Sequence, residues 1–241
     1  VLGWTDAMGS TIEDATNMLA RSLSADGTRP TGTVYMDANK DVRGTTRSWQ
    51  CSSTATELTG LGITSEILTN PWPYSIANKP DILGAVMGAA APYLPAGSYY
   101  LPGSIAESLT SWSGIIDYSG IGQFRMTQHS ALGVAGTSGT VTEPFAVSGK
   151  FPAARIHAHY ARGCTMGEAF GQSVQQPYHL LIMGDPLCRP HAIIPVVSVT
   201  DLLDGAVVGG TIQVTPEATT ASTNGIASLA LFLDGLPFGD A

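Results

Sequence analysis

The sequence contains few charged residues, and this narrows the partners that it suits. Lys, Arg, Asp and Glu make up 12% of its 241 residues, against roughly 25% in ordinary globular domains. The net charge is −8, and the densest basic stretch is 43–47. A protein that binds a phosphate backbone needs clustered Lys and Arg, so we expect no nucleic-acid partner. The uncharged polar composition instead indicates a bacterial protein that is secreted or held at the cell surface.

Long apolar runs are also missing. No stretch approaches the roughly 18 residues that cross a bilayer, so we expect no transmembrane segment. The chain starts at Val1 without a charged and then apolar leader. We expect that a signal peptide precedes it in the precursor.

Cysteine is scarce and odd in number, with Cys51, Cys164 and Cys188 only. In an exported protein this predicts one bridge and a free thiol, or no bridge at all. Of the three pairings, we favour Cys164–Cys188 because it closes a short loop. Over any bridge, however, we favour three buried thiols that act as small apolar side chains. None of them has the spacing of a zinc site.

The first 192 residues alternate between helical and strand patterns. The capping box of Ser10 and Glu13 predicts a helix start. Buried-strand composition and helical periodicity favour a mostly parallel sheet with helices on both faces. We expect helices at 10–23, 46–61, 152–162 and from 165 onward, and strands at 32–36, 65–68, 81–91, 131–135 and 179–183, with 105–116 ambiguous between strand and helix.

The pattern changes after residue 192. Segments 195–200, 210–215 and 227–233 alternate apolar and polar residues and are separated by Gly and Asp turns, which is typical of an all-β sandwich. We therefore predict an α/β domain at 1–192 and the start of an Ig-like sandwich at 193–241. Since such sandwiches need about 100 residues, we expect the natural chain to continue past Ala241.

Four segments carry a resemblance to a known family. They are SIAESLTSWS at 104–113, GTSGTVTEP at 136–144, ARGCTMGEA at 161–169 and LIMGDPL at 181–187. In this order they resemble a family of exported bacterial proteins, and GTVYMD at 32–37 extends the match more loosely. That family is similar to the gingipain-type cysteine peptidases, which have a caspase-like α/β fold followed by an Ig-like module. The resemblance therefore implies the same two-domain order here.

The resemblance also implies where a catalytic dyad would lie. Peptidases of this fold carry His–Gly after one buried strand and Cys after the next, because the imidazole must assist proton transfer from the thiol. Here the first strand ends at 87–91 without His, and 107–114 contains no Cys. Ser108 stands where relatives often have His. The sequence thus favours a protein of peptidase-like fold that is not an enzyme.

Other residue types leave a displaced active site open. Ser108 or Ser111 could replace Cys as the nucleophile, with His129 as base and Asp117 as its orienting group. Glu143 and Asp185 follow predicted strands, where ligands bind in parallel sheets. For Asp185 we favour a turn residue that bonds to the backbone.

A calcium loop is a further alternative. Asp37, Asn39 and Asp41 have the oxygen spacing of such a loop, but Val42 and Ser48 stand where it needs Gly and Glu. The other interpretation is a polar turn in which Asp37 and Asn39 bond to the backbone. We otherwise expect no cofactor.

These observations lead to three hypotheses of different classes. The first is a non-catalytic caspase/gingipain-like domain of an exported multi-domain protein that acts in binding or assembly. The second is a peptidase-like hydrolase with a displaced Ser or Thr nucleophile. The third is a structural subunit of a surface layer or filament. A protein or a cell-surface glycan is the partner that we expect, and a homo-oligomer is left open. Exposed aromatics at 71–74 and 99–100 could stack on sugar or peptide.

Overall fold

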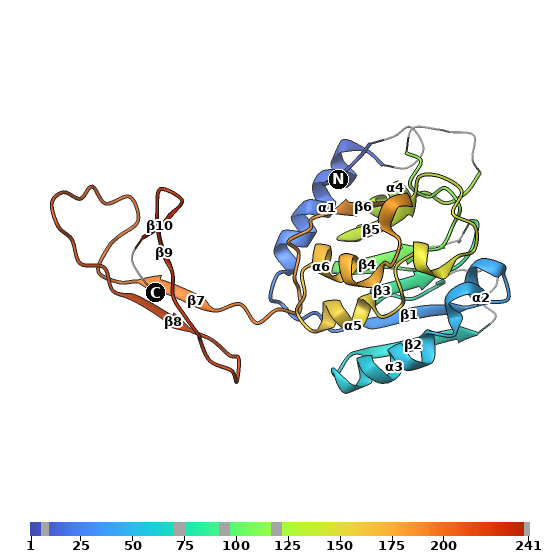
Figure 1. Ribbon diagram of the computed structural model, residues 1–241, viewed down its shortest axis with the longest axis horizontal. Helices are drawn as coiled ribbons and strands as arrows, with labels where there is room; N and C mark the ends of the chain where they lie inside the picture. Colours follow the sequence, from blue (N-terminus) through green and yellow to red (C-terminus); the bar gives the residue numbers. More distant parts are fainter. Residues whose placement is uncertain (6–9, 70–75, 92–96, 117–121, 239–241) are drawn as a thin grey trace. The chain divides into compact units, whose positions relative to one another are not determined.

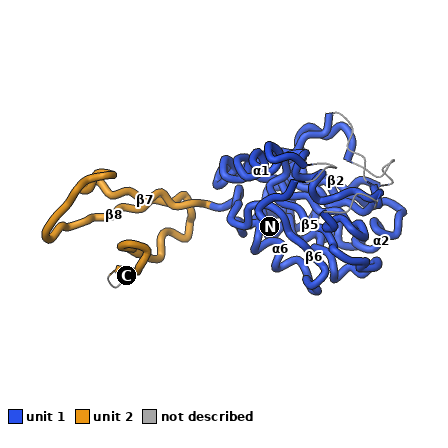
Figure 2. Tube along the Cα trace, turned by 90° about the horizontal axis from the view of Figure 1, so that it is seen from above, with its two compact units in different colours: residues 1–192 blue, residues 193–241 orange. Residues whose placement is uncertain are grey.

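The computed structural model describes residues 1–5, 10–69, 76–91, 97–116 and 122–238. The chain divides into two compact units, residues 1–192 and 193–241 (Figure 2). The division falls where the composition changes. The aromatic segment 71–74 and Asp117 lie outside the described residues.

The first unit is built on a six-stranded mixed sheet (Figure 1). The strand order is β2-β1-β3-β4-β5-β6, and every pair is parallel except β5 with β6. The sheet is therefore mostly parallel, as the alternation of patterns predicts. The strands are β1 (Thr33–Ala38), β2 (Thr64–Thr69), β3 (Ile82–Met87), β4 (Tyr100–Ser108), β5 (Gly136–Thr140) and β6 (Leu180–Gly184).

Helices cover both faces of this sheet (Figure 1). The alternation of side chains along a strand shows which helices lie on which face. In β1, Val34 and Met36 pack with α3 and α5, whereas Tyr35 belongs to a separate cluster on the other face. That other face is also covered by α1 and α4. The helices are α1 (Ile12–Ala25), α2 (Val42–Ser48), α3 (Cys51–Gly60), α4 (Met126–Ala131), α5 (Ile156–Ala161) and α6 (Met166–Ser173).

Two helix predictions need correction. The N-terminal capping box uses Thr11 and Asp14, one residue later than predicted, because Thr11 has the extended backbone that a cap requires. The single helix expected at 46–61 is two helices, since α2 is capped by Asp41 at its start and by Trp49 at its end. Gln50 N–H then bonds to Arg47 O at 2.9 Å, and the chain turns into α3. The helix expected from 165 onward is confirmed, and a capping box of Thr165 and Glu168 closes the start of α6.

Strands β4 and β5 also differ from expectation. The ambiguous segment 105–116 contributes the end of β4, which begins earlier, at Tyr100. The apolar run 131–135 is not a strand: it closes α4 and turns at Gly133, whose φ is +85°. The last parallel strand of the sheet is instead β5, whose residues are small and polar. All five of them are buried. The burial of β5 depends on small residues, because Gly139 lies against the backbone of Gly114. A Cβ added at Gly139 would lie 2.4 Å from the backbone nitrogen of Gly114.

The second unit contains four short strands in two antiparallel pairs. β7 (Val196–Val199) pairs with β8 (Pro216–Thr219), and β9 (Leu231–Leu233) pairs with β10 (Leu236–Phe238). β7 lies within the predicted segment 195–200, and β9 forms only the last part of the predicted segment 227–233. Segment 210–215 is not a strand in the structure, and the partner of β7 lies just after it. No helix in the described part of the chain is long and apolar enough to span a membrane.

Candidate functional site

The ends of three parallel strands lie side by side at one edge of the sheet. Met36 of β1 is paired with Val86 of β3, and Met87 is paired with Ser108 of β4. Ligands of parallel α/β sheets bind at this carboxyl edge. The candidate site is therefore expected at these strand ends.

A buried ion pair lies at this edge. Arg47 of α2 donates from Nη1 to Glu107 Oε1 at 3.1 Å, and both side chains are 3% exposed or less. Arg47 also donates to the carbonyls of Met87 and Pro152. Burial raises the pKa of Glu107 to about 7, although the charge of Arg47 opposes this shift. The guanidinium thus joins α2 to β3, β4 and the segment before α5.

The helix α2 packs directly on the end of β3. A Cβ at Gly88 would lie 2.5 Å from Gly44 Cα, so the two backbones are in contact and neither position has room for a side chain. Asn39 Nδ2 donates to Gly88 O at 2.9 Å. Gly88 lies at the position of the His–Gly segment that the gingipain resemblance implies, and Ala89 beside it is buried.

The predicted calcium ligands bond to one another and to the backbone. Asn39 donates to Asp37 from Nδ2 at 2.6 Å and from its backbone N–H at 3.0 Å. Asp41 N–H donates to Asn39 Oδ1, and the Asp41 carboxylate caps α2 through Arg43 N–H. Among the described residues, no group of three His, Cys, Asp or Glu side chains is placed to hold a metal ion.

The two serine candidates lie at the end of β4. Ser108 is 1% exposed, and its Oγ has no hydrogen-bond partner among the described residues. Ser111 is half-buried, and its carbonyl accepts from Thr140 Oγ1 at 2.8 Å. A nucleophilic serine needs a base within hydrogen-bond reach, and Ser108 has none in this arrangement.

His129, the candidate base, is sealed in the core. It lies on α4 at 0% exposure and packs edge-on against Phe124, with ring centroids 4.6 Å apart, and against Tyr100. Neither ring nitrogen has a partner in the described part of the chain. Burial lowers the pKa of His129 to about 3. Its proposed orienting group, Asp117, lies outside the described residues.

Glu143 and Asp185 do not share a site, because the strands that precede them run in opposite directions. Glu143 follows β5, whereas β6 is antiparallel and pairs Gly184 with Gly136 at the start of β5. Asp185 therefore lies at the amino edge of the parallel strands, and the expectation that it lies at the ligand-binding edge is wrong. Both side chains accept a backbone N–H two residues ahead, at 2.9 and 3.0 Å.

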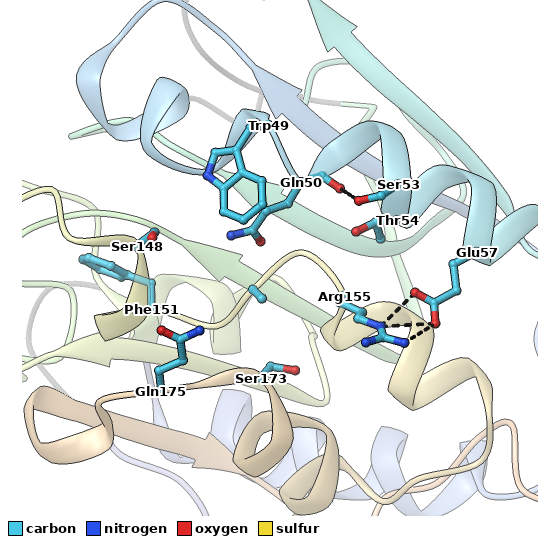
Figure 3. Close-up of a pocket in the computed structure, with 12 residues that line it drawn as sticks. Trp49, Gln50, Ser53, Thr54, Glu57, Ser148, Phe151, Arg155, Ser173 and Gln175 are labelled. Atoms are coloured by element: carbon cyan, nitrogen blue, oxygen red, sulfur yellow. Dashed lines mark hydrogen bonds and ion pairs between the residues drawn. The ribbon is translucent and has the colours of Figure 1, made fainter.

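A groove of about 470 Å³ opens next to the buried ion pair. One wall is the corner between α2 and α3, and the other comes from η1 (Ser148–Lys150), the segment up to Arg155 and the end of α6 (Figure 3). Phe151 lines the groove and also lies 5.9 Å from the guanidinium carbon of Arg47. The buried pair thus supports the floor of this groove.

The side chains of the groove are aromatic and amide in character. The indole of Trp49 is 71% exposed. Gln50 and Gln175 extend from opposite walls into the space between them (Figure 3). Gln50 Oε1 accepts Ala154 N–H at 2.8 Å, which connects the two walls.

The charged residues that line the groove are Glu57 and Arg155. Arg155 donates from Nε and Nη2 to Glu57, at 2.9 to 3.2 Å, at one end of the groove (Figure 3). Arg162 also contacts Glu57. The hydrogen bonds from Arg155, in the first place, lower the pKa of Glu57. The groove therefore carries one carboxylate with two arginine partners at its end and neutral donors and acceptors along its length.

All three cysteines are free, as the favoured interpretation without a bridge predicts, and the alternative pairing Cys164–Cys188 is not formed. Cys188 is buried beside Tyr160, whose hydroxyl donates to Sγ at 3.2 Å. Burial raises the pKa of the Cys188 thiol to about 11 and also raises the pKa of Cys51. Two of the three thiols thus act as small core side chains.

We expect a thiol-disulfide dye to titrate one fast-reacting thiol in the native chain, Cys164, which is half-buried. Cys51 and Cys188 react only on unfolding because they are excluded from solvent and held as thiols. The measurement is the absorbance of the released dye with and without denaturant. Fewer than three reactive thiols in the unreduced, denatured chain would contradict the free-thiol arrangement.

The composition gives no direct signal for several of these residues. Glu107 is the one charged residue in a strand of buried type, and Arg47 is one of few basic residues. A salt bridge between the two could therefore have been proposed from the sequence as a hypothesis. The groove residues come from 49–57, 148–155 and 173–175. Nothing local marks them as neighbours.

Comparison of the chain with models of protein families, with curated proteins and with solved structures found no match.

Proposed function

We propose that residues 1–192 are a non-catalytic domain of the caspase/gingipain-like class, and that they act in binding within an exported or cell-surface bacterial protein. The groove beside the carboxyl edge is its binding site, and residues 193–241 belong to an Ig-like module. The mostly parallel sheet with helices on both faces supports this assignment, since it is the architecture that the family resemblance implies.

The register of β3 and β4 carries the proposal. Met87 is paired with Ser108, so the two positions that a His/Cys dyad would occupy are adjacent in this fold. Gly88 there is packed against Gly44, and Ser108 is buried without a base. General acid–base chemistry needs a titratable group within about 3 Å of the reacting proton. The open groove lies beside this edge instead, and it presents binding groups.

A fluorophosphonate probe and a chloromethyl-ketone peptide probe test the catalytic alternative on the full chain. We expect neither to label it, because Ser108 Oγ has no base within reach among the described residues and Gly88 stands where the resemblance implies His–Gly. The readout is intact mass and peptide mapping, with a serine hydrolase and a cysteine peptidase as positive controls.

Labelling that maps to Ser108 or Ser111 would contradict the proposal. The variants Ser108→Ala and Ser111→Ala identify the reacting residue. Ser53→Ala is the matched control, since Ser53 lies on the groove wall and donates to Gln50 O. Labelling that survives all three substitutions places a nucleophile elsewhere and equally contradicts a non-catalytic domain.

A further inference from the structure

The groove between the α2–α3 corner and the segment before α5 has the chemistry of a sugar site. We propose that it binds a neutral oligosaccharide, with one pyranose ring stacked on the indole of Trp49. This inference rests on the proposed binding function of the domain and names its ligand class.

Trp49 provides a fixed aromatic platform. Its Nε1–H donates to Thr46 O at 3.1 Å, which holds the ring at the end of α2, yet the side chain is 71% exposed. Large aromatic side chains gain most from burial, and Tyr100, Phe151 and Phe170 in this chain are buried. An indole with its polar edge bonded and its apolar surface open suits the apolar C–H face of a pyranose.

Side-chain amides and hydroxyls surround this platform. Gln50 uses its Oε1 for Ala154 N–H, so its Nε2 group supplies donors to the groove. Gln175 extends from the opposite wall, and Ser148 lies on the same side (Figure 3). An amide can donate and accept at once, which matches the vicinal hydroxyls of a sugar.

The charge of the groove argues for a neutral ligand. The Nε and Nη2 groups of Arg155 both donate to the Glu57 carboxylate, and Arg162 contacts the same carboxylate. The overall charge of −8 opposes an anionic ligand further.

The size of the groove argues for a small ligand over a folded protein. Its volume of about 470 Å³ lies within the roughly 300–1,000 Å³ of small-molecule sites. A stable protein interface needs roughly 800 Å² from each partner, and the groove is closed at one end by the Glu57–Arg155 pair. A few sugar rings match this space.

The test is a titration of the ¹⁵N-labelled full chain with cellohexaose, maltohexaose, xylohexaose, mannohexaose and chitohexaose. We expect at least one of them to shift amide signals of 49–57, 148–155 and 173–175 saturably. Trp49→Ala should weaken that binding by about tenfold or more, and Trp49→Phe by less, because a smaller ring keeps part of the stacking. Gln175→Ala should also weaken this binding, because it removes an exposed amide that can bond to sugar hydroxyls.

Trp4→Ala is the matched control, since Trp4 is another exposed indole, at 42%, outside the groove. Circular dichroism of each variant confirms the fold. If none of the five sugars shifts the amide signals of the groove residues, or if Trp49→Ala binds the sugar as well as the native chain does, the sugar proposal fails.

The outcomes also separate this proposal from the proposed function. If a neutral peptide library shifts the amide signals of the groove and the sugars do not, the sugar assignment is wrong. The domain would still be a binding domain. Labelling by the active-site probes overturns the binding function itself, whatever the sugars do.

Discussion

Replacement of Arg47 by methionine is expected to remove about 3–5 kcal/mol from the free energy of unfolding of the first unit. Methionine fills a similar volume but leaves Glu107 buried without its ion-pair partner. It also leaves the carbonyls of Met87 and Pro152 without their donor. Each unsatisfied buried group adds a desolvation cost.

Urea unfolding of the full chain, followed by tryptophan fluorescence, measures this loss. The signal reports on the first unit alone because all four tryptophans lie in it. They are Trp4, Trp49, Trp72 and Trp112.

Arg43→Met is the control for a basic residue on the same helix. Arg43 pairs with Asp41 at 3.3 Å, and both side chains are about a quarter exposed, so we expect a change below about 1 kcal/mol. The double variant Arg47→Met/Glu107→Gln should regain part of the stability, since it removes the unpaired charge. Equal losses for Arg47→Met and Arg43→Met would show that the buried pair does not hold α2 to the sheet.

The second large effect is a loss of stability in acid caused by buried histidine. Burial lowers the pKa of His129 to about 3 and of His157 to about 4, from about 6.5 in the unfolded chain. Below pH 6.5 the unfolded state therefore binds protons that the folded state excludes. Each such histidine removes on the order of 1.4 kcal/mol per pH unit, until the pH reaches its folded pKa.

Glu107 acts in the opposite direction. Its folded pKa of about 7 lies above its ordinary value of 4.5, so its contribution to stability is present below pH 4.5 and is lost as the pH rises through 7. Between these values the two effects partly offset one another in the native chain. The steepest acid loss from these groups should therefore fall between about pH 4.5 and pH 4, since below pH 4 His157 is protonated in the folded state as well.

His129→Leu isolates the histidine term. The difference in unfolding free energy between this variant and the native chain should grow as the pH falls from 6.5, because leucine binds no proton. Urea unfolding at a series of pH values measures it. His159→Leu is the comparison, since burial lowers the pKa of the half-buried His159 in the same direction and we expect its pH-dependent difference to be smaller. A pH-independent difference for His129→Leu would contradict the exclusion of protons from this site.

Much of the fold follows from local patterns. β3 lies where a continuous apolar run predicts a doubly buried strand, and α6 begins at the capping box of Thr165 and Glu168. β5 could not be predicted, because GTSGT has no apolar side chain, and its burial depends on the close approach of Gly114. Its neighbouring run 131–135 is apolar but packs as a helix end and turn.

The candidate site was less accessible to sequence reasoning. Ser108, His129 and Asp37 were identified by residue type, but only the packing shows that His129 is enclosed by rings. The direction of β6 moved Asp185 to the opposite edge of the sheet from Glu143. Strand direction depends on pairing across the sheet, which no local periodicity records.

The sequence alone determined the low charge, the α/β and β-rich patterns and the lack of His and Cys at the strand ends, because these depend on composition and near neighbours. Only the tertiary structure decided that Arg47 meets Glu107 and that Trp49 and Gln175 border one groove. Such contacts join residues that are 60 and more positions apart. They arise from how strands pair and helices pack, and the residues themselves carry no local sign of them.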